Sequence, residues 1–433
     1  MRAFRLSSLF LLGLLLLVFA CENTAQDSTS QAEPETRELS PRVRTGAELL
    51  LADGLNWVEG KKVAVVANQT SMVGDRHLVD TLLSRGIEVV KVFSPEHGFR
   101  GTADAGARIS NSRDIETGLP IVSLYGRNKK PTVAQLADVD VVVFDIQDVG
   151  TRFYTYLSTM TYVLEACIEQ QKKFLVLDRP NPNGWYVDGP VLEATNSSFI
   201  GLHEIPIVHG MTLGEYAGLV SKEGWLSNGI SAESLLVVIP CEGYHHGMQW
   251  EETGLPWISP SPNLATEYAA YLYPAICWFE PTPVSVGRGT DSAFTLVGAP
   301  WYGAANARES ADWEAYGLRA KRVGFTPHSL PGKSTYPKFQ DEMCQGLDFQ
   351  NRVEGKELFL AGLSLLKEMY LIHGEVGPDE PFFQTNFERW PGTTELEEQV
   401  KAGMSPEQIY ESWQPKVDEF KAMRARYLLY PKN

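Results

Sequence analysis

Short apolar runs alternate with segments of helical spacing in the first half of the chain. Four runs are continuous enough for strands that are buried on both faces. They span residues 62–67, 88–93, 139–146 and 174–178, with a further run at 234–239. Residues 76–85 and 155–171 have the spacing of helices. This alternation predicts an α/β fold, in which a Rossmann-like, mostly parallel sheet carries helices on both faces.

The pattern changes near residue 240, where Gly, Pro, Trp and Tyr become frequent. Helical spacing returns at residues 355–372 and 405–427. We therefore expect a Rossmann-like catalytic domain over residues 43–240 and a smaller α+β C-terminal domain over residues 241–433 that closes a cleft.

The N-terminal segment predicts export. Arg2 and Arg5 precede an apolar run over residues 9–20, which is too short to indicate a membrane span. Ala20-Cys21 at its end resembles the cleavage site of a bacterial lipoprotein, although an ordinary secretory signal with an incidental cysteine is the alternative. We expect residues 1–20 to be a signal peptide and Cys21 to carry lipid, so that the protein faces the periplasm or the cell surface on a bacterial membrane.

Residues 21–42 are rich in Ser, Thr, Gln, Glu and Pro, and predict a disordered tether. Among the 433 residues the formal net charge is −16, which argues against a nucleic-acid partner because such partners demand clustered Lys and Arg. The membrane contact that we expect is therefore the N-terminal lipid alone.

The four cysteines after Cys21 show no CxxC spacing. They are Cys167, Cys241, Cys277 and Cys344. Export permits disulfides, but buried free thiols are the interpretation we favour.

Polar residues follow each of the four main strands. The clusters are 68–70, 94–101, 145–152 and 178–182. Ligands bind beyond the carboxyl ends of parallel strands, so these clusters predict one site. Each residue also has a purely structural interpretation: Glu96 could cap a helix, and Asp145 could pair with Arg179 to hold a loop.

The motifs of several enzyme classes are missing. The sequence has no GxGxxG after the first strand, no Walker A motif, no GxSxG and no HExxH, and its histidines are scattered. Carboxylates supported by Arg, Asn and aromatic groups remain, and paired carboxylates cleave glycosidic bonds. Five aromatic residues could stack on sugars or pack in the core. They are Tyr125, Tyr154, Trp250, Trp257 and Trp278.

Ordered motifs along nearly all of the chain resemble the NamZ-type exo-β-N-acetylmuramidase family. The matching segments are 67–70, 93–98, 122–126, 143–156, 177–182, 209–212, 259–263 and 287–290. The resemblance implies hydrolysis of N-acetylmuramic acid from the non-reducing end of peptidoglycan fragments, with no metal or nucleotide cofactor. It also implies a catalytic role for Glu96, in the motif Ser94-Pro95-Glu96-His97-Gly98.

The roles that we expect start from Glu96 as the general acid. His97 and Asp148 are candidates to tune or orient it. The second catalytic group is Asp145, Asp148 or Asp178, or else the 2-acetamido oxygen of the substrate.

The lactyl carboxylate of N-acetylmuramic acid demands a cation, for which a guanidinium fork is suited. The candidates are Arg100, Arg152, Arg179 and Arg288. The other substrate-binding candidates are Asn68, Tyr125, Gln147, Tyr154, Asp178, Asn181, His209 and Asn263.

Two other functions fit the same clusters. The first is a carbohydrate-binding lipoprotein without turnover, which would keep its binding when Glu96 is lost. The second is a metal-dependent hydrolase, which a chelator would inactivate.

Overall fold

The structure is a computed structural model that describes residues 42–101, 112–229, 232, 234–303 and 312–433. These residues belong to one compact unit that starts at Pro41. The predicted signal peptide and Cys21 lie outside the described residues, as does the tether apart from Arg42.

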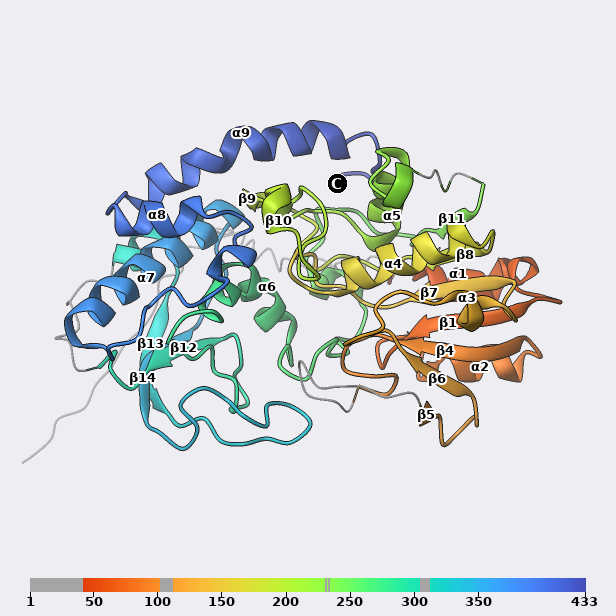
Figure 1. The fold of residues 1–433 in the computed structure, drawn as a ribbon, viewed down its shortest axis with the longest axis horizontal. Helices are drawn as coiled ribbons and strands as arrows, with labels where there is room; N and C mark the ends of the chain where they lie inside the picture. The colour runs from red at the N-terminus through yellow and green to blue at the C-terminus, as the bar shows by residue number, and fades with distance from the viewer. Residues whose placement is uncertain (1–41, 102–111, 230–231, 233, 304–311) are drawn as a thin grey trace, which may run out of the picture. The chain divides into compact units, whose positions relative to one another are not determined.

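A central sheet of seven strands organises the first part of the unit (Figure 1). Its strands, in spatial order, are β11 (Leu236–Ile239), β8 (Lys173–Leu177), β7 (Val141–Asp145), β1 (Lys62–Ala67), β4 (Glu88–Ser94), β6 (Pro120–Ser123) and β5 (Ser112–Arg113). The first six are parallel, and only the edge strand β5 runs antiparallel. Numbered along the chain, the parallel strands stand in the order 3-2-1-4-5-6, which is the Rossmann order. The predicted fold class is confirmed.

Strand β1 shows why both faces of the sheet are covered. Val63 and Val65 pack with α1 (Gly46–Asp53) and α2 (Leu78–Ser84) in one apolar cluster. Ala64 and Val66 point to the other face and pack with α4 (Tyr156–Glu169) and α5 (Leu213–Lys222). Alternate side chains of a strand point to opposite faces, so a run without polar residues must be covered twice.

The second part is built on a three-stranded antiparallel sheet and long helices (Figure 1). The sheet holds β12 (Leu296–Ala299), β14 (Cys344–Phe349) and β13 (Ala320–Phe325), in that order. The helices are α6 (Glu267–Ile276), α7 (Gly355–Val376), α8 (Glu395–Lys401) and α9 (Pro406–Arg424). One continuous apolar core includes residues of α4, α5, α6 and α7, so the two parts pack without an open seam between them. The predicted boundary at residue 240 stays a prediction.

The smaller elements connect these parts. They are β2 (Met72–Val73), β3 (Arg76–His77), α3 (Val133–Leu136), β9 (Asp188–Val191) and β10 (Pro206–Val208). Single 3₁₀ turns lie at Leu55–Trp57, Ala194–Asn196, Ser227–Gly229, Trp250–Thr253, Cys277–Phe279, Asp312–Tyr316 and Phe387–Arg389.

The predicted helix at 76–85 begins two residues later than expected. Arg76 and His77 pair with β2 in a hairpin, and the His77 ring accepts a hydrogen bond from the backbone N–H of Val79 at 3.2 Å. His77 therefore caps α2 instead of belonging to it. The other predicted strands and helices match observed ones to within a few residues at each end.

The four described cysteines are free and buried, as predicted. Within the described ranges, no helix combines the length and apolar character that a membrane crossing requires. Nor do the described residues bring together three or more His, Cys, Asp or Glu side chains that could hold a metal ion.

Candidate active site

The turn after β4 presents the candidate acid. Its backbone is left-handed at His97, with φ of 71°, and at Gly98, with φ of 80°. A non-glycine residue in this region is uncommon, and such conformations gather at functional sites. His97 is buried and Glu96, directly before it, is half-buried. The turn therefore holds Glu96 at the carboxyl edge of the sheet, where part of its side chain reaches solvent.

Two hydroxyl groups hold the Glu96 carboxylate. Thr155 Oγ1 donates to Glu96 Oε2 at 2.9 Å. Tyr125 also makes a side-chain hydrogen bond to Glu96, and burial, followed by the charge of Glu96, raises the pKa of the Tyr125 hydroxyl above its usual range. Thr155 precedes α4 and makes no capping bond to it, so its hydroxyl is available for Glu96.

Asp148 is the second notable acid of the site. It is 6% exposed, and its Oδ2 accepts the backbone N–H of Gly150 at 2.7 Å. Its Oδ1 has no hydrogen-bond partner among the described residues. Burial raises the pKa of Asp148 to about 7, against the lowering effect of backbone hydrogen bonds from Gly150 and Val149. The group is therefore near the midpoint of its titration at neutral pH.

Tyr156 lies within electrostatic range of both acids. Burial raises the pKa of its hydroxyl, and the charges of Glu96 and Asp148 raise it further. Tyr156 receives a hydrogen bond from Asn68 Nδ2 at 2.9 Å and donates to the carbonyl of Pro260 at 2.7 Å. The strand ends β1, β4 and β7 thus meet around one tyrosine.

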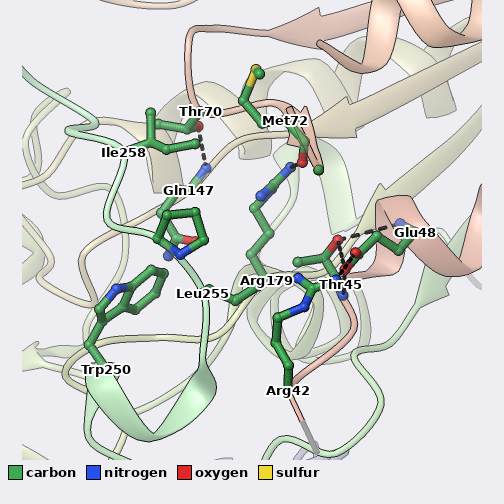
Figure 2. Close-up of a pocket in the computed structure, with 12 residues that line it drawn as sticks. Arg42, Thr45, Glu48, Thr70, Met72, Gln147, Arg179, Trp250, Leu255 and Ile258 are labelled. Carbon is green, nitrogen blue, oxygen red and sulfur yellow. Dashed lines mark hydrogen bonds and ion pairs between the residues drawn. The ribbon is translucent and has the colours of Figure 1, made fainter. Parts of the chain in front are cut away.

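A cavity of about 270 Å³ lies at the same edge of the sheet (Figure 2). Thr70 follows β1, Gln147 follows β7 and Arg179 follows β8, and all three line it. The cavity thus touches the point between β1 and β7 where the strand order reverses, where ligands of this fold bind. Trp250 lines the cavity opposite Arg179, as Figure 2 shows. Glu96 is not among its lining residues, so the cavity and the candidate acid occupy separate parts of the strand-end surface.

Three of the candidate arginines are paired with acids. Arg179 binds Asp145 at 2.6 and 3.0 Å, which is the structural pairing that we considered for Asp145. Two further pairs are Arg100 with Asp114, at 2.9 and 3.2 Å, and Arg288 with Glu280, at 2.9 and 2.9 Å.

Arg152 is turned entirely to the protein. It is 1% exposed, and its two terminal nitrogens donate to four carbonyl groups at 2.7–2.8 Å. The acceptors are Pro190, Ile205, Trp390 and Pro391. Burial without a carboxylate partner lowers the pKa of Arg152 to about 9. Its two terminal nitrogens are occupied by carbonyls of segments far apart in the sequence, so a substrate carboxylate has no free terminal nitrogen to bind.

Other candidates also serve the framework. Asp178 is fully buried and accepts hydrogen bonds from Thr212, Tyr430 and the backbone of Gly214. Asn181 and Gln147 donate to backbone carbonyls, and burial lowers the pKa of His209 to about 3.

The candidate Asn263 keeps a buried polar atom, its Oδ1, without a partner among the described residues. Trp278 is fully buried in the core, which removes it as a sugar-stacking residue.

Sequence reasoning missed several residues that shape the site. Thr155 and Tyr156 follow the third strand cluster, but nothing in their spacing distinguishes them from helix-start residues. Tyr273 of α6 contacts Tyr154, with ring centroids 6.0 Å apart, and the charges of Glu280 and Arg288 act on its hydroxyl. This contact joins α6 to the strand-end loops, and only the tertiary structure reveals it.

A half-buried carboxyl group held by two hydroxyls at the strand ends has the equipment of a general acid, which is the group that a glycoside hydrolase requires. Comparison with known families makes this specific. Residues 63–268 match the family description "Exo-beta-N-acetylmuramidase NamZ, N-terminal", and residues 271–430 match its C-terminal counterpart. The chain belongs to the NamZ family of exo-β-N-acetylmuramidases.

Individual relatives agree. The chain is 36% identical over 428 residues to the peptidoglycan beta-N-acetylmuramidase NamZ of Bacillus subtilis (strain 168), covering 97% of this chain and 98% of that protein. Two crystal structures of DUF1343 family proteins from Bacteroides fragilis are also similar. One has a TM-score of 0.75 at 39% identity and the other 0.77 at 30% identity, and each match covers 90% of this chain and 99% of the other.

Proposed function

We propose that this protein releases N-acetylmuramic acid from the non-reducing end of peptidoglycan fragments, with Glu96 as the general acid. The observation that carries this proposal is the position of Glu96, half-buried in a left-handed turn and held by two hydroxyl groups, in a chain that matches a NamZ relative along its whole length. In the reaction the protonated Glu96 gives its proton to the glycosidic oxygen as the bond to the anomeric carbon breaks.

Thr155 and Tyr125 have a positioning role in this scheme. Each hydroxyl fixes the carboxyl group in space, so little reorganisation is required when the substrate arrives.

The three acids that we predicted as second catalytic groups are poorly placed for direct attack. Asp145 and Asp178 are fully buried in hydrogen bonds to the protein, and Asp148 is also buried, with 6% of it exposed. This favours attack on the anomeric carbon by the 2-acetamido oxygen of the substrate. The proposed route retains the β configuration, so proton NMR of the first product should show β-N-acetylmuramic acid before mutarotation. Initial formation of the α anomer would refute it.

Arg288 is the cation that we assign to the lactyl carboxylate. It is 23% exposed, whereas Arg152 is enclosed by carbonyls. Glu280 raises the pKa of Arg288 despite the opposing effect of burial, so the guanidinium stays charged. Its Nε and Nη2 bind Glu280, which leaves Nη1 for a substrate.

The test is Glu96→Gln on a chromogenic muramic acid glycoside. We expect turnover to fall about 10²–10⁴-fold, as for the loss of a general acid. Glu88→Gln, at the exposed start of the same strand, is the matched control and should keep its activity. A non-catalytic carbohydrate-binding protein would show no turnover even as wild type, and chelator treatment of the wild type tests the metal-dependent alternative.

We also propose that the protein is exported and anchored by lipid at Cys21. The support is the order of Arg2, Arg5, the apolar run at 9–20 and Ala20-Cys21. Labelling of the expressed protein with a fatty acid should mark the wild type and fail with Cys21→Ala, which should move from the membrane fraction to the soluble fraction. Equal labelling of both forms would refute the anchor.

A further inference from the structure

The loop between β13 and β14 carries an aromatic side chain in open solvent. Tyr336 is 90% exposed. Among the described residues, the other large apolar side chains that are exposed are all aliphatic or Met. An exposed aromatic face can stack on the apolar face of a ligand, so an aromatic residue on an anchored loop is a candidate for binding.

The backbone on both sides of Tyr336 is fixed. Two residues later, the Lys338 ammonium donates to the carbonyls of Phe279, Glu280, Thr282 and Val284. Burial lowers the pKa of Lys338 to about 8, against the raising effect of Glu280.

Before the tyrosine, the carbonyl of Lys333 accepts from Asn263 Nδ2 at 2.7 Å, and its ammonium pairs with Asp291 at 3.2 Å. A short antiparallel bridge between Leu330 and Ser334 closes the turn. The backbone that carries Tyr336 is thus anchored on both sides, so this part of the loop loses little further freedom when a ligand binds.

The loop also rests on a glycine. Gly289 has φ of 84°, and a Cβ there would lie 2.7 Å from the carbonyl oxygen of His328 and from the ring of Pro337. His328 N–H donates to the Gly289 carbonyl at 2.8 Å. The loop therefore packs directly against the turn that presents Arg288.

The same loop is joined to the strand ends that hold Glu96. Asn263 ends the segment 259–263, whose Ser259 carbonyl accepts from Gln69 and whose Pro260 carbonyl accepts from Tyr156. Tyr156 is adjacent to Thr155, which binds Glu96. A chain of direct contacts leads from the candidate acid to the base of the Tyr336 loop.

We propose that Tyr336 is an aromatic platform for the saccharide on the leaving side of the scissile bond, and this rests on the proposed function. An exo-acting enzyme takes one sugar into its catalytic position and leaves the remaining chain outside. The apolar C–H face of an N-acetylated glucosamine ring complements an exposed aromatic ring, while its hydroxyls stay in water. The Tyr336 loop contacts the segment 259–263, and this segment contacts the strand-end residue Tyr156, so we assign the tyrosine to the sugars outside the catalytic position.

The experiment compares Tyr336→Ala with wild type on two substrates. One is a chromogenic muramic acid glycoside, which has no sugar on the leaving side. The other is a peptide-free glycan chain of alternating muramic acid and glucosamine. We expect kcat/KM to fall about three- to tenfold on the glycan chain, mainly through KM, and to stay unchanged on the chromogenic glycoside. Tyr336→Trp should restore activity on the glycan chain.

Leu429→Ala is the matched control, because Leu429 is 51% exposed and belongs to a different surface, beside α5. Equal activity of Tyr336→Ala and wild type on the glycan chain, or an equal loss on both substrates, would overturn the platform. A change of oligomeric state in light scattering would overturn it as well, since a second copy would then cover the ring. Failure of the wild type on the chromogenic glycoside would refute the proposed function itself, so the two failures are distinguishable.

Discussion

The substitution Asp148→Asn tests whether burial keeps this carboxyl group protonated. The pKa of Asp148 is about 7 in the folded protein because of burial. An aspartate in an unfolded chain titrates near pH 3.9, so the difference of about 3 units corresponds to about 4 kcal/mol.

The sign follows from proton binding. Between pH 4 and pH 7 the folded protein binds the proton that the unfolded chain has released, so stability falls as the pH rises through this window and levels off above it. Asparagine keeps an oxygen for the Gly150 N–H, and its amide takes the place of the Oδ1 that lacks a partner among the described residues. The buried amide donors cost about 1–3 kcal/mol, but this cost does not depend on pH.

We therefore expect the stability of Asp148→Asn, relative to wild type, to improve by about 4 kcal/mol from pH 4 to pH 8.5. Urea unfolding at four pH values measures this difference, since the titration of other groups cancels between the two proteins. Asp138→Asn is the control that should stay flat over this range, because the hydrogen bond from Lys91 lowers the pKa of Asp138 and its titration therefore lies below pH 4. A relative stability that stays constant over this range, or that worsens towards pH 8.5, would show that Asp148 is ionised in the folded protein.

Three further outcomes follow from contacts in the structure. Thr155→Val removes a hydroxyl that holds Glu96 and should lower kcat about tenfold while KM stays unchanged. Thr155→Ser should restore the activity. An effect on KM alone would contradict the positioning role. Arg152→Met leaves four carbonyls without their donor and should lower the free energy of unfolding in urea by at least about 3 kcal/mol, whereas unchanged stability would contradict the framework role. Gly289→Ala places a Cβ on a left-handed backbone and against neighbouring atoms, and should lower the free energy of unfolding by more than Gly60→Ala does. At Gly60 φ is also positive but nothing lies within 4 Å of the added Cβ, so roughly 1–2 kcal/mol is expected there. Equal losses in urea unfolding would show that the loop adjusts to the added Cβ.

The sequence predicts the sheet well because its strands are covered on both faces. The run at 62–67 has no polar residue after Lys62 and can only be a buried strand, and β1 has the predicted bounds. Strand β6 was not predicted, because its four residues, Pro120–Ser123, are too few to show a periodic pattern of apolar and polar positions. The predicted helix start at Arg76 was wrong because a tight hairpin, which depends on pairing with Met72, takes the first two residues.

The candidate site was predictable in part. The positions of Glu96 and Asp148 were predictable because each follows a strand, and parallel strands bring such positions to one edge, whereas their catalytic roles stay predictions. The role of Arg152 was not predictable, because two of its acceptors, Trp390 and Pro391, lie more than two hundred residues away. The same holds for Lys338, whose four carbonyl acceptors belong to a turn before β12. Polar contacts between distant segments leave no periodic signal in a sequence.

The four buried cysteines offer a way to follow where the folded protein opens. Burial raises the pKa of each thiol, so an alkylating reagent at neutral pH meets hardly any thiolate while the fold is closed. The positions differ usefully: Cys167 is in α4 behind the large sheet, Cys241 follows β11, Cys277 directly follows α6 and Cys344 begins β14. Pulse alkylation followed by peptide mass mapping would thus time the exposure of four separate regions without any engineered label.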